Sequence, residues 1–424
     1  MQHESGGVMR EPRNTQNTRK NGEVKSEGVD FNAEAQRRRG EWFGDVPSDW
    51  DIGKMRSVVS ERREKFNRDE ELIILSLLKD VGIIPYSEKG DVGNKSKEDH
   101  SQYKVARKGD LVINSMNVII GSVGISLYDG YISPAYYSFV PRENVCMGFI
   151  GYLCSTRRFQ KAVRCYAKGI MEIRLRVSSY DFLSMPIPLP PLSEQEAIVK
   201  YLDAETGRID KAIAAEEKMI AHLQERREIV INEAVSGSAK CGSDFNAEAQ
   251  RRRGWEVRKV KQCAIIEHGS NPKIDGDVPV YGSGAESFKT CGEFKEGPSV
   301  LLGRKGTVNI PRYVEGRFWN VDTAFNVCTR KNMLLRFFYY CATCFDYDRY
   351  VSQTAIPSMT QRDYENMPIP LPPLAEQEEI VKYLDAGTGK IDRAIDVKRR
   401  QIELLRERRQ IVIDEAVTGK VKVA

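Results

Sequence analysis

The strongest constraint on this chain is a segment of 53 residues that occurs twice. Residues 185–237 and 367–419 are related by a fixed offset of 182 positions, and 36 of the 53 positions are identical. Repetition this strong indicates that one structural unit is used twice. Each copy opens with a proline-rich strip, where fixed φ angles and missing N–H groups exclude a helix, and closes at a glycine suited to stopping one.

Between the proline strip and the closing glycine, each copy has the pattern of a long helix. Apolar residues recur at alternating spacings of three and four, which is a heptad seam. The seam positions include Leu202, Ile209, Ile213, Glu216, Ile220 and Leu223 in the first copy and Leu384, Ile391, Ile395, Lys398, Ile402 and Leu405 in the second. A helix of about 43 residues would be roughly 65 Å long. We expect both helices to continue through Gly207 and Gly389 and to pair with each other.

The order of segments along the chain determines how the two helices pair. The first helix leads into residues 241–366 and the second leaves them, so one end of each helix lies beside that segment. The sequence therefore predicts an antiparallel two-helix coiled coil with approximate two-fold symmetry, separating two globular α+β domains. Glu216 and Lys398 occupy equivalent positions near the helix centres, where antiparallel pairing would allow an ion pair. Two separately solvated charges are the alternative.

The remaining sequence divides by composition into domains, a tail and a linker. The expected divisions are a disordered tail (1–40), a first domain (41–184), the first strip and helix (185–240), a linker (241–254), a second domain (255–366) and the second strip and helix (367–424). Both domains mix short apolar runs with turn signals, which is typical of α+β folds. The undecapeptide DFNAEAQRRRG occurs at 30–40 and at 244–254, and a solvated linker explains it better than a phosphate contact does.

Composition and motifs argue against catalysis and against a membrane protein. The chain has 65 basic and 60 acidic side chains, so nucleic-acid binding would depend on local patches. It has no apolar run of about 20 residues, and its nine scattered cysteines suit reduced thiols in the cytoplasm. Phosphate-binding loops, methyltransferase motifs and histidine clusters are absent from the sequence. We expect no metal site, and we expect the Cys341–Cys344 pair to pack in a buried helix.

Two loop stretches have the composition of DNA contacts. In Gly303–Thr307, glycines flank Arg304 and Lys305 and Thr307 follows, which would allow close approach to phosphates or guanine. In the first half, residues 109–117 look equivalent, and Asn114 and Asn117 are suited to reading adenine edges. For each residue, a tight turn beside a strand is the alternative interpretation.

Over residues 41–424 the chain resembles the specificity subunits of type I restriction-modification systems. The resemblance rests on IPLPPLxEQ at 187–195 and 369–377, on the helix ends EAVSG at 233–237 and EAVTG at 415–419, and on the order domain, helix, domain, helix. The segments YGSG (281–284), GRKGT (303–307) and FWNVDTAF (318–325) also resemble a common type of target-recognition domain.

The resemblance implies a non-catalytic subunit whose two target-recognition domains each read one half of a split, asymmetric site in double-stranded DNA. It also implies two modification subunits that bring S-adenosylmethionine, and restriction subunits that use ATP and Mg. We expect the outward-facing apolar residues of the two helices to form docking strips for partner helices. The alternative is that they only widen the seam between the two helices of this chain. These residues are Ile198, Tyr201, Ile229, Ile380, Tyr383 and Ile411. The main alternative is a coiled-coil scaffold or adaptor that binds only proteins, and a stand-alone nuclease or methyltransferase is a further one.

Overall fold

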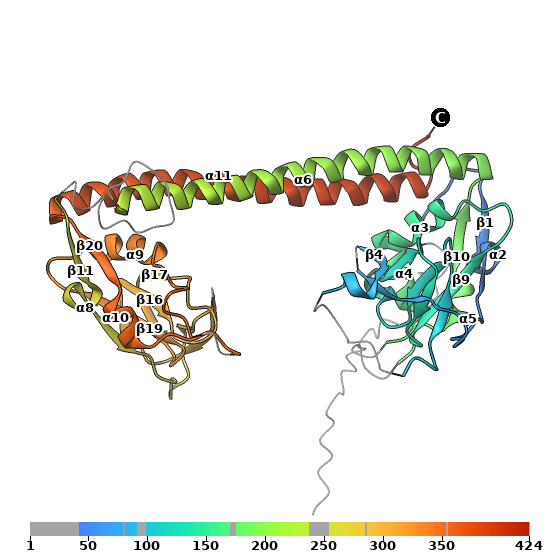
Figure 1. Ribbon diagram of the computed structural model, residues 1–424. Helices are drawn as coiled ribbons and strands as arrows, with labels where there is room; N and C mark the ends of the chain where they lie inside the picture. Colours follow the sequence, from blue (N-terminus) through green and yellow to red (C-terminus); the bar gives the residue numbers. More distant parts are fainter. Residues whose placement is uncertain are drawn as a thin grey trace, which may run out of the picture. The chain divides into compact units, whose positions relative to one another are not determined.

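The computed structural model describes residues 42–79, 81–90, 99–169, 175–236, 254–284, 286–352 and 355–423. The chain divides into two compact units, the first made of Met1–Asp203 with Gln410–Ala424 and the second of Ala204–Arg409. Each unit holds one sheet-rich domain and parts of both long helices (Figure 1). The expected tail and most of the expected linker lie outside the described residues.

The two repeated segments form two long, unbroken helices. Helix α6 spans Leu192–Ser236 and helix α11 spans Leu374–Val417, and they lie side by side (Figure 1). Both continue through their internal glycines, as predicted. Each helix begins shortly after its proline strip and ends before the expected glycine, so the sequence located both ends to within a few residues.

Ion pairs in the second unit show that α6 and α11 are antiparallel. Arg227 on α6 pairs with Asp392 on α11, and Arg409 on α11 pairs with Asp210 on α6, each with a nitrogen–oxygen distance of 3.0 Å. Asp392 and Arg409 are the repeat equivalents of Asp210 and Arg227, so the same contact occurs twice with the helices exchanged. This is the local signature of an approximate two-fold axis.

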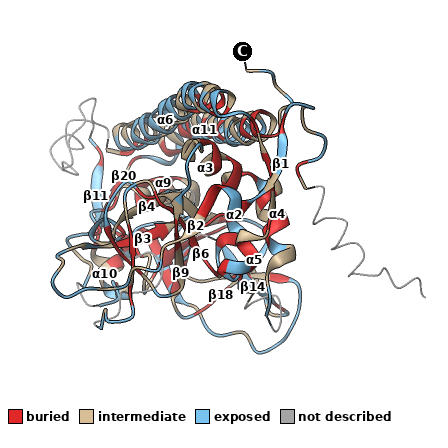
Figure 2. Cartoon of the chain, turned by 90° about the vertical axis from the view of Figure 1, so that its right-hand side faces the viewer, coloured by how far each residue is buried: buried red, intermediate tan, exposed pale blue. Residues whose placement is uncertain are grey.

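The predicted ion pair at the centre of the helices is present. The Nζ atom of Lys398 lies 2.9 Å from a carboxylate oxygen of Glu216, and the two side chains are 29% and 24% exposed. All the predicted seam residues are buried or half-buried, while the opposite faces of α6 and α11 are largely exposed (Figure 2). The heptad interpretation is therefore confirmed.

The ends of the helices belong to the domain cores. In the first unit, the core includes Ile198 and Leu202 from the start of α6, and Ile413 and Val417 from the end of α11. In the second unit it includes residues from the end of α6 and Leu384 from the start of α11. The prediction that Ile198 faces outward was wrong: it is 1% exposed, because this first stretch of α6 is covered by its domain.

The first domain consists of two four-stranded sheets and short helices. One sheet has the order β2-β9-β6-β7 and the other β4-β3-β8-β5, in which β3 and β8 are parallel. The strands are β2 (Val59–Glu61), β3 (Ile73–Leu78), β4 (Gly82–Pro85), β5 (Lys104–Ala106), β6 (Leu111–Asn114), β7 (Val123–Ile125), β8 (Gly130–Ile132) and β9 (Tyr136–Pro141). The helices are α2 (Met55–Val58), α3 (Met147–Ser155), α4 (Arg157–Tyr166) and α5 (Ser179–Leu183).

The second domain repeats this topology strand for strand. Its sheets have the orders β12-β19-β16-β17 and β14-β13-β18-β15, with β13 and β18 parallel. The strands are β12 (Ala264–His268), β13 (Val278–Tyr281), β14 (Ser287–Cys291), β15 (Lys295–Glu296), β16 (Ser299–Gly303), β17 (Arg312–Val314), β18 (Arg317–Asn320) and β19 (Ala324–Thr329). The helices are α8 (Val260–Cys263), α9 (Leu335–Thr343) and α10 (Gln361–Asn366). Two domains with little sequence similarity therefore share one α+β fold.

Each proline strip is a strand with a partner at the start of its domain. Strand β10 (Pro186–Leu189) pairs antiparallel with β1 (Asp51–Lys54), and β20 (Pro368–Leu371) pairs antiparallel with β11 (Glu256–Lys259). Both ladders have only two strands, so every strand is an edge, where prolines are tolerated. The sequence predicted the extended conformation of the strips but not their pairing.

The Glu-Gln pair after each strip fixes the junction between domain and helix. In the first copy, the indole nitrogen of Trp50 donates to Glu194 (3.0 Å), and the side-chain amide of Gln195 donates to the carbonyl of Pro190 (2.9 Å). Gln195 is buried, so its hydrogen bonds also satisfy buried backbone. The second copy repeats both contacts, between Trp255 and Glu376 (2.9 Å) and between Gln377 and Pro372 (2.8 Å).

Candidate nucleic-acid interface

Three segments that are distant in sequence meet in the second domain. The segment YGSG begins at the last residue of β13, and GRKGT begins at the last residue of β16. The segment FWNVDTAF includes the residues that come directly before β19. The backbone N–H of Arg304 donates to the carbonyl of Thr323 (2.8 Å), and the N–H of Val321 donates to Tyr281 (3.0 Å). The three segments that resemble a common type of target-recognition domain therefore form one loop cluster, which we call the 304 loop cluster.

The loop at the centre of this cluster requires both of its glycines. A side chain at Gly303 would collide with the carbonyl of Thr307, and Gly306 has a φ of +83°. Beneath the loop, the buried hydroxyl of Tyr364 on α10 lies 2.7 Å from the carbonyl oxygen of Gly303 and 3.0 Å from that of Val308. Burial raises the pKa of Tyr364, so the hydroxyl keeps the proton with which it holds the loop.

The loop cluster presents cationic side chains with different surroundings. Arg304 donates to the carbonyl of Asp322 (3.1 Å), whereas the side chain of Lys305 is exposed and Thr307 is half-buried. Arg312 at the start of β17 lies over the ring of Tyr281, 5.1 Å from its centroid. Its Nη1 atom is buried without a hydrogen-bond partner among the described residues. Burial lowers the pKa of this guanidinium, because it disfavours the charged form. A phosphate or the acceptor edge of a base would stabilise the charge and would also give Nη1 a hydrogen-bond partner.

In the first domain, a hollow of about 760 Å³ occupies the corresponding place. Its lining comes from β3, from the loop after β6 and from the residues before β9, which are the counterparts of the segments in the 304 loop cluster. Lys79, Lys89 and Arg176 line it, and no carboxylate does within the described part of the chain. Basic residues therefore outnumber acidic ones among the described residues that line this hollow, a composition suited to a polyanion.

The structure places Asn114 and Asn117 in the same loop of this hollow, in different roles. Asn114 is buried, and its side-chain oxygen accepts hydrogen bonds from the N–H groups of Met116 (3.0 Å) and Asn117 (3.4 Å). That geometry stabilises the turn. The side chain of Asn117 is exposed on the lining.

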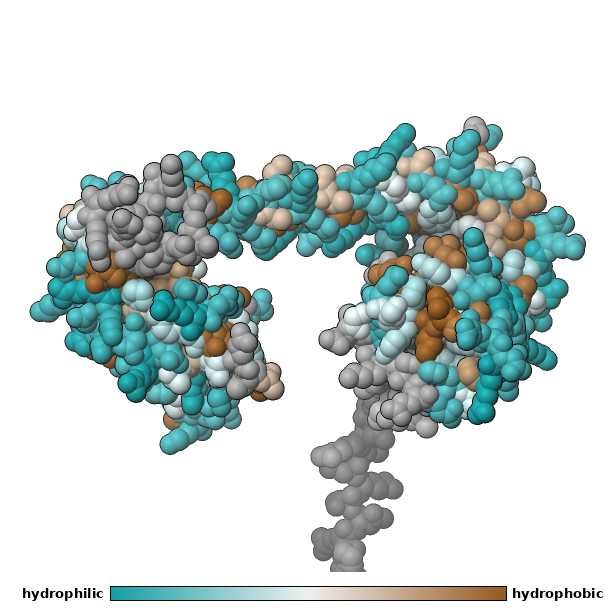
Figure 3. Space-filling model, viewed as in Figure 1, coloured by the Kyte–Doolittle hydropathy of each residue, from teal (hydrophilic) through white to brown (hydrophobic). Residues whose placement is uncertain are grey.

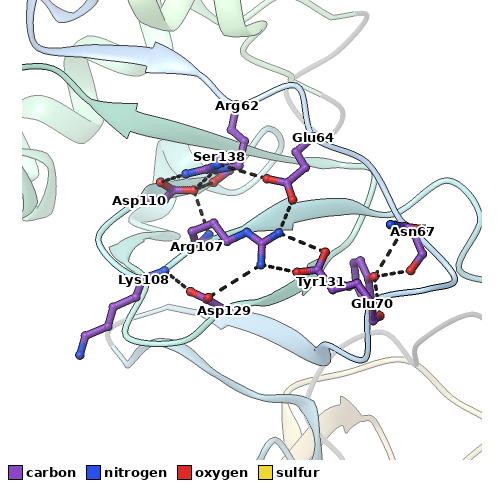
Figure 4. Close-up of polar contacts among 10 residues, drawn as sticks. All are labelled: Arg62, Glu64, Asn67, Glu70, Arg107, Lys108, Asp110, Asp129, Tyr131 and Ser138. Carbon is purple, nitrogen blue, oxygen red and sulfur yellow. Dashed lines mark hydrogen bonds and ion pairs between the residues drawn. The ribbon is translucent and has the colours of Figure 1, made fainter.

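At the other end of β6, several charged residues of the domain pair with one another (Figure 4). Asp110, which precedes β6, accepts two hydrogen bonds from Arg62 (2.5 and 2.9 Å) and one from Ser138 (2.7 Å). Arg107 binds Glu70 (2.6 Å) and also Glu64. These contacts raise the pKa of both arginines, through hydrogen bonds to Asp110 and to Glu70 above all. The network joins residues beside β2, β6 and β9 of one sheet to Arg107 beside β5 of the other, so these charges are engaged within the domain.

Other chemical candidates have structural roles. The carboxylate of Glu293 accepts hydrogen bonds from the N–H groups of Lys273 and Ile274, and Lys295 donates to Asn320, so both side chains hold neighbouring segments of the second domain together. Within the described residues, no group of three potential ligands is placed to hold a metal ion, and no helix is long and apolar enough to cross a bilayer. Cys341 is buried in α9 and Cys344 follows that helix, and burial raises the pKa of both thiols, that of Cys344 to about 11.

Comparisons with known proteins identify the same family that the sequence motifs resemble. The family model for the type I restriction modification DNA specificity domain matches residues 47–224 and 252–405. The putative type I restriction enzyme MjaX specificity subunit of Methanocaldococcus jannaschii is 22% identical over 419 residues, which covers 90% of this chain and 96% of that protein. The type I restriction enzyme MjaVIII specificity subunit of the same organism is 23% identical over 435 residues, covering 89% and 94%.

A solved structure shows the same fold. It comes from a study of complex assembly and conformational transition of the type I R-M system, and it aligns with a TM-score of 0.68 at 18% identity. The alignment covers 89% of this chain and 100% of that chain. With the family model matching both halves, the chain belongs to the type I restriction modification DNA specificity family.

Proposed function

We propose that this chain is the DNA sequence-recognition subunit of a type I restriction-modification complex. The observation that carries the proposal is the repeated architecture: one α+β topology used twice, joined by one repeated helix, with different side chains at the equivalent loop clusters. Domains that share a scaffold but present different loops would read different sequences. The target would be double-stranded DNA with two unlike halves, and the unread gap would be between about one and two turns.

The proposed role requires no catalysis by this chain. Its cationic residues are suited to binding: the 304 loop cluster presents Arg304 and Lys305, and the hollow of the first domain presents cations and the amide of Asn117. Methylation and cleavage would belong to partner subunits, which would bind S-adenosylmethionine, ATP and Mg. A subunit that reads the chromosome would act in the cytoplasm.

Helix α11 has a surface suited to those partners. Tyr383, Val397 and Leu404 are 61%, 57% and 50% exposed, and their spacings of 14 and 7 residues place them on one face of the helix. Hydrophobic residues are scattered on the largely hydrophilic surface of the helix pair (Figure 3). We propose this face of α11 as a docking strip for modification subunits, through which restriction subunits would join the complex.

Methylome sequencing of the host tests the proposal. A split motif methylated on both strands, which disappears when the gene for this chain is deleted and returns on complementation, is the expected result. A methylome that does not change on deletion, together with absent or salt-insensitive DNA binding by the assembled complex, would instead favour a protein-binding scaffold.

A further inference from the structure

The loop after β6 and the loop after β16, which we call the reading loops, occupy the same place in the two domains. Each loop has eight residues, 115–122 between β6 and β7 and 304–311 between β16 and β17. The strand before each loop ends on an equivalent pair, Asn114 opposite Tyr136 and Gly303 opposite Ala324.

Backbone hydrogen bonds establish the register one residue further into each loop. The N–H of Ser115 donates to Ala135 (3.1 Å), and the N–H of Arg304 donates to Thr323 (2.8 Å). The carbonyl of Ser115 accepts from Val177 (2.8 Å), and that of Arg304 accepts from Met359 (2.9 Å). Ser115, Met116 and Asn117 therefore correspond to Arg304, Lys305 and Gly306.

These equivalent positions carry different hydrogen-bonding chemistry. The first loop offers one exposed amide, that of Asn117, because Asn114 is occupied with the turn. The second loop offers the exposed ammonium of Lys305 beside Arg304. An asparagine amide matches the N6 and N7 atoms of adenine, whereas lysine and arginine match the O6 and N7 atoms of guanine.

We propose that the half-site read by the first domain contains an adenine recognised by Asn117, and that the other half-site contains a guanine recognised by Lys305. The inference rests on the proposed function and assigns a base class to each reading loop. Lys79 and Arg176 line the same hollow, and the proposal assigns them to phosphates, contacts that would carry no base preference.

The test is a binding selection with the assembled complex of this chain and its modification subunits, on DNA in which both half-sites are randomised. Asn117→Ala should reduce the preference for adenine at one position of one half-site by about 10-fold or more, and leave the other half-site unchanged. Lys305→Ala should do the same for a guanine in the other half-site. The preserved half-site shows in each case that the complex is folded.

Matched controls are Asn144→Gly, at an exposed turn with a φ of +61°, and Lys331→Ala, at an exposed lysine beyond β19, and neither should change a preference. The inference is overturned if either loop variant relaxes the preference for a different base, or if both variants act on the same half-site. It is also overturned if binding falls equally for all sequences. A wild-type complex that selects no split motif would refute the proposed function itself, which separates the two failures.

Discussion

Tyr364→Phe should loosen the 304 loop cluster without disturbing the core around it. The substitution removes only the hydroxyl, and the ring retains its edge contact with Phe325, at 5.9 Å between centroids. The buried carbonyls of Gly303 and Val308 then lose a donor, which costs about 1–2 kcal/mol. A change of that size corresponds to a factor of roughly 5–30 in a local opening equilibrium.

Amide hydrogen exchange measured by mass spectrometry is the appropriate assay, because it reports loop opening peptide by peptide. Peptides covering 299–312 should exchange roughly 5–30 times faster in the variant, and those covering 111–125 should not change. Tyr347→Phe is the matched control: it also removes a buried tyrosine hydroxyl in this domain, but that hydroxyl donates to Ala342 in α9, and the ring keeps its contact with Tyr364. Unchanged protection of 299–312, or equal loosening in both variants, would refute the role of Tyr364.

Three further predictions concern the helices, pH and salt. Glu216→Lys should destabilise the helix pair by about 1–2 kcal/mol in urea melts followed at 222 nm, and adding Lys398→Glu should restore most of the loss; the absence of any recovery would contradict the ion pair. Burial and the hydrogen bond to Asp385 raise the pKa of Tyr340 to about 12, so its contribution to stability is complete below about pH 10 and is lost as pH rises through about 12. Tyr340→Phe should therefore reduce the loss of thermal stability between about pH 10 and pH 12. A pH profile identical to that of the unsubstituted protein would contradict the raised pKa of Tyr340. Arg176→Ala should weaken DNA binding for all sequences alike and reduce the salt slope by about 1, whereas an unchanged slope would exclude a phosphate contact.

The sequence predicted the helices well because their determinants are local and repeated. A heptad seam specifies the buried face of a helix wherever it occurs, and the order of segments set the antiparallel direction. The ion pair between Glu216 and Lys398 followed from seam position alone. Ile198 was misplaced because periodicity identifies an apolar face without showing which neighbour covers it.

The shared topology of the two domains was beyond the reach of the sequence. Strand pairing depends on contacts over long separations, such as that between β1 and β10, and many different apolar residues satisfy the same burial pattern. The domains consequently retain strand order and register while their sequences differ.

The candidate site was predicted in part. The glycines around Arg304 and Lys305 correctly indicated a tight loop, but Tyr364 was missed because its repeat equivalent is Phe182, which has no hydroxyl. The difference has a physical reason: in the first domain the side chain of Asn114 stabilises the turn, and glycine at the equivalent position cannot. Whether each proposed side chain contacts DNA stays a prediction, since amides and cations serve turns and bases equally well.

Two equivalent domains that read two separate stretches of DNA should leave two separate footprints. The measurement is hydroxyl-radical footprinting of the complex of this chain with its modification subunits, on DNA carrying the methylated motif. We expect two protected patches separated by an unprotected gap of between about one and two helical turns. One continuous protected patch, or protection of only one half of the motif, would contradict it.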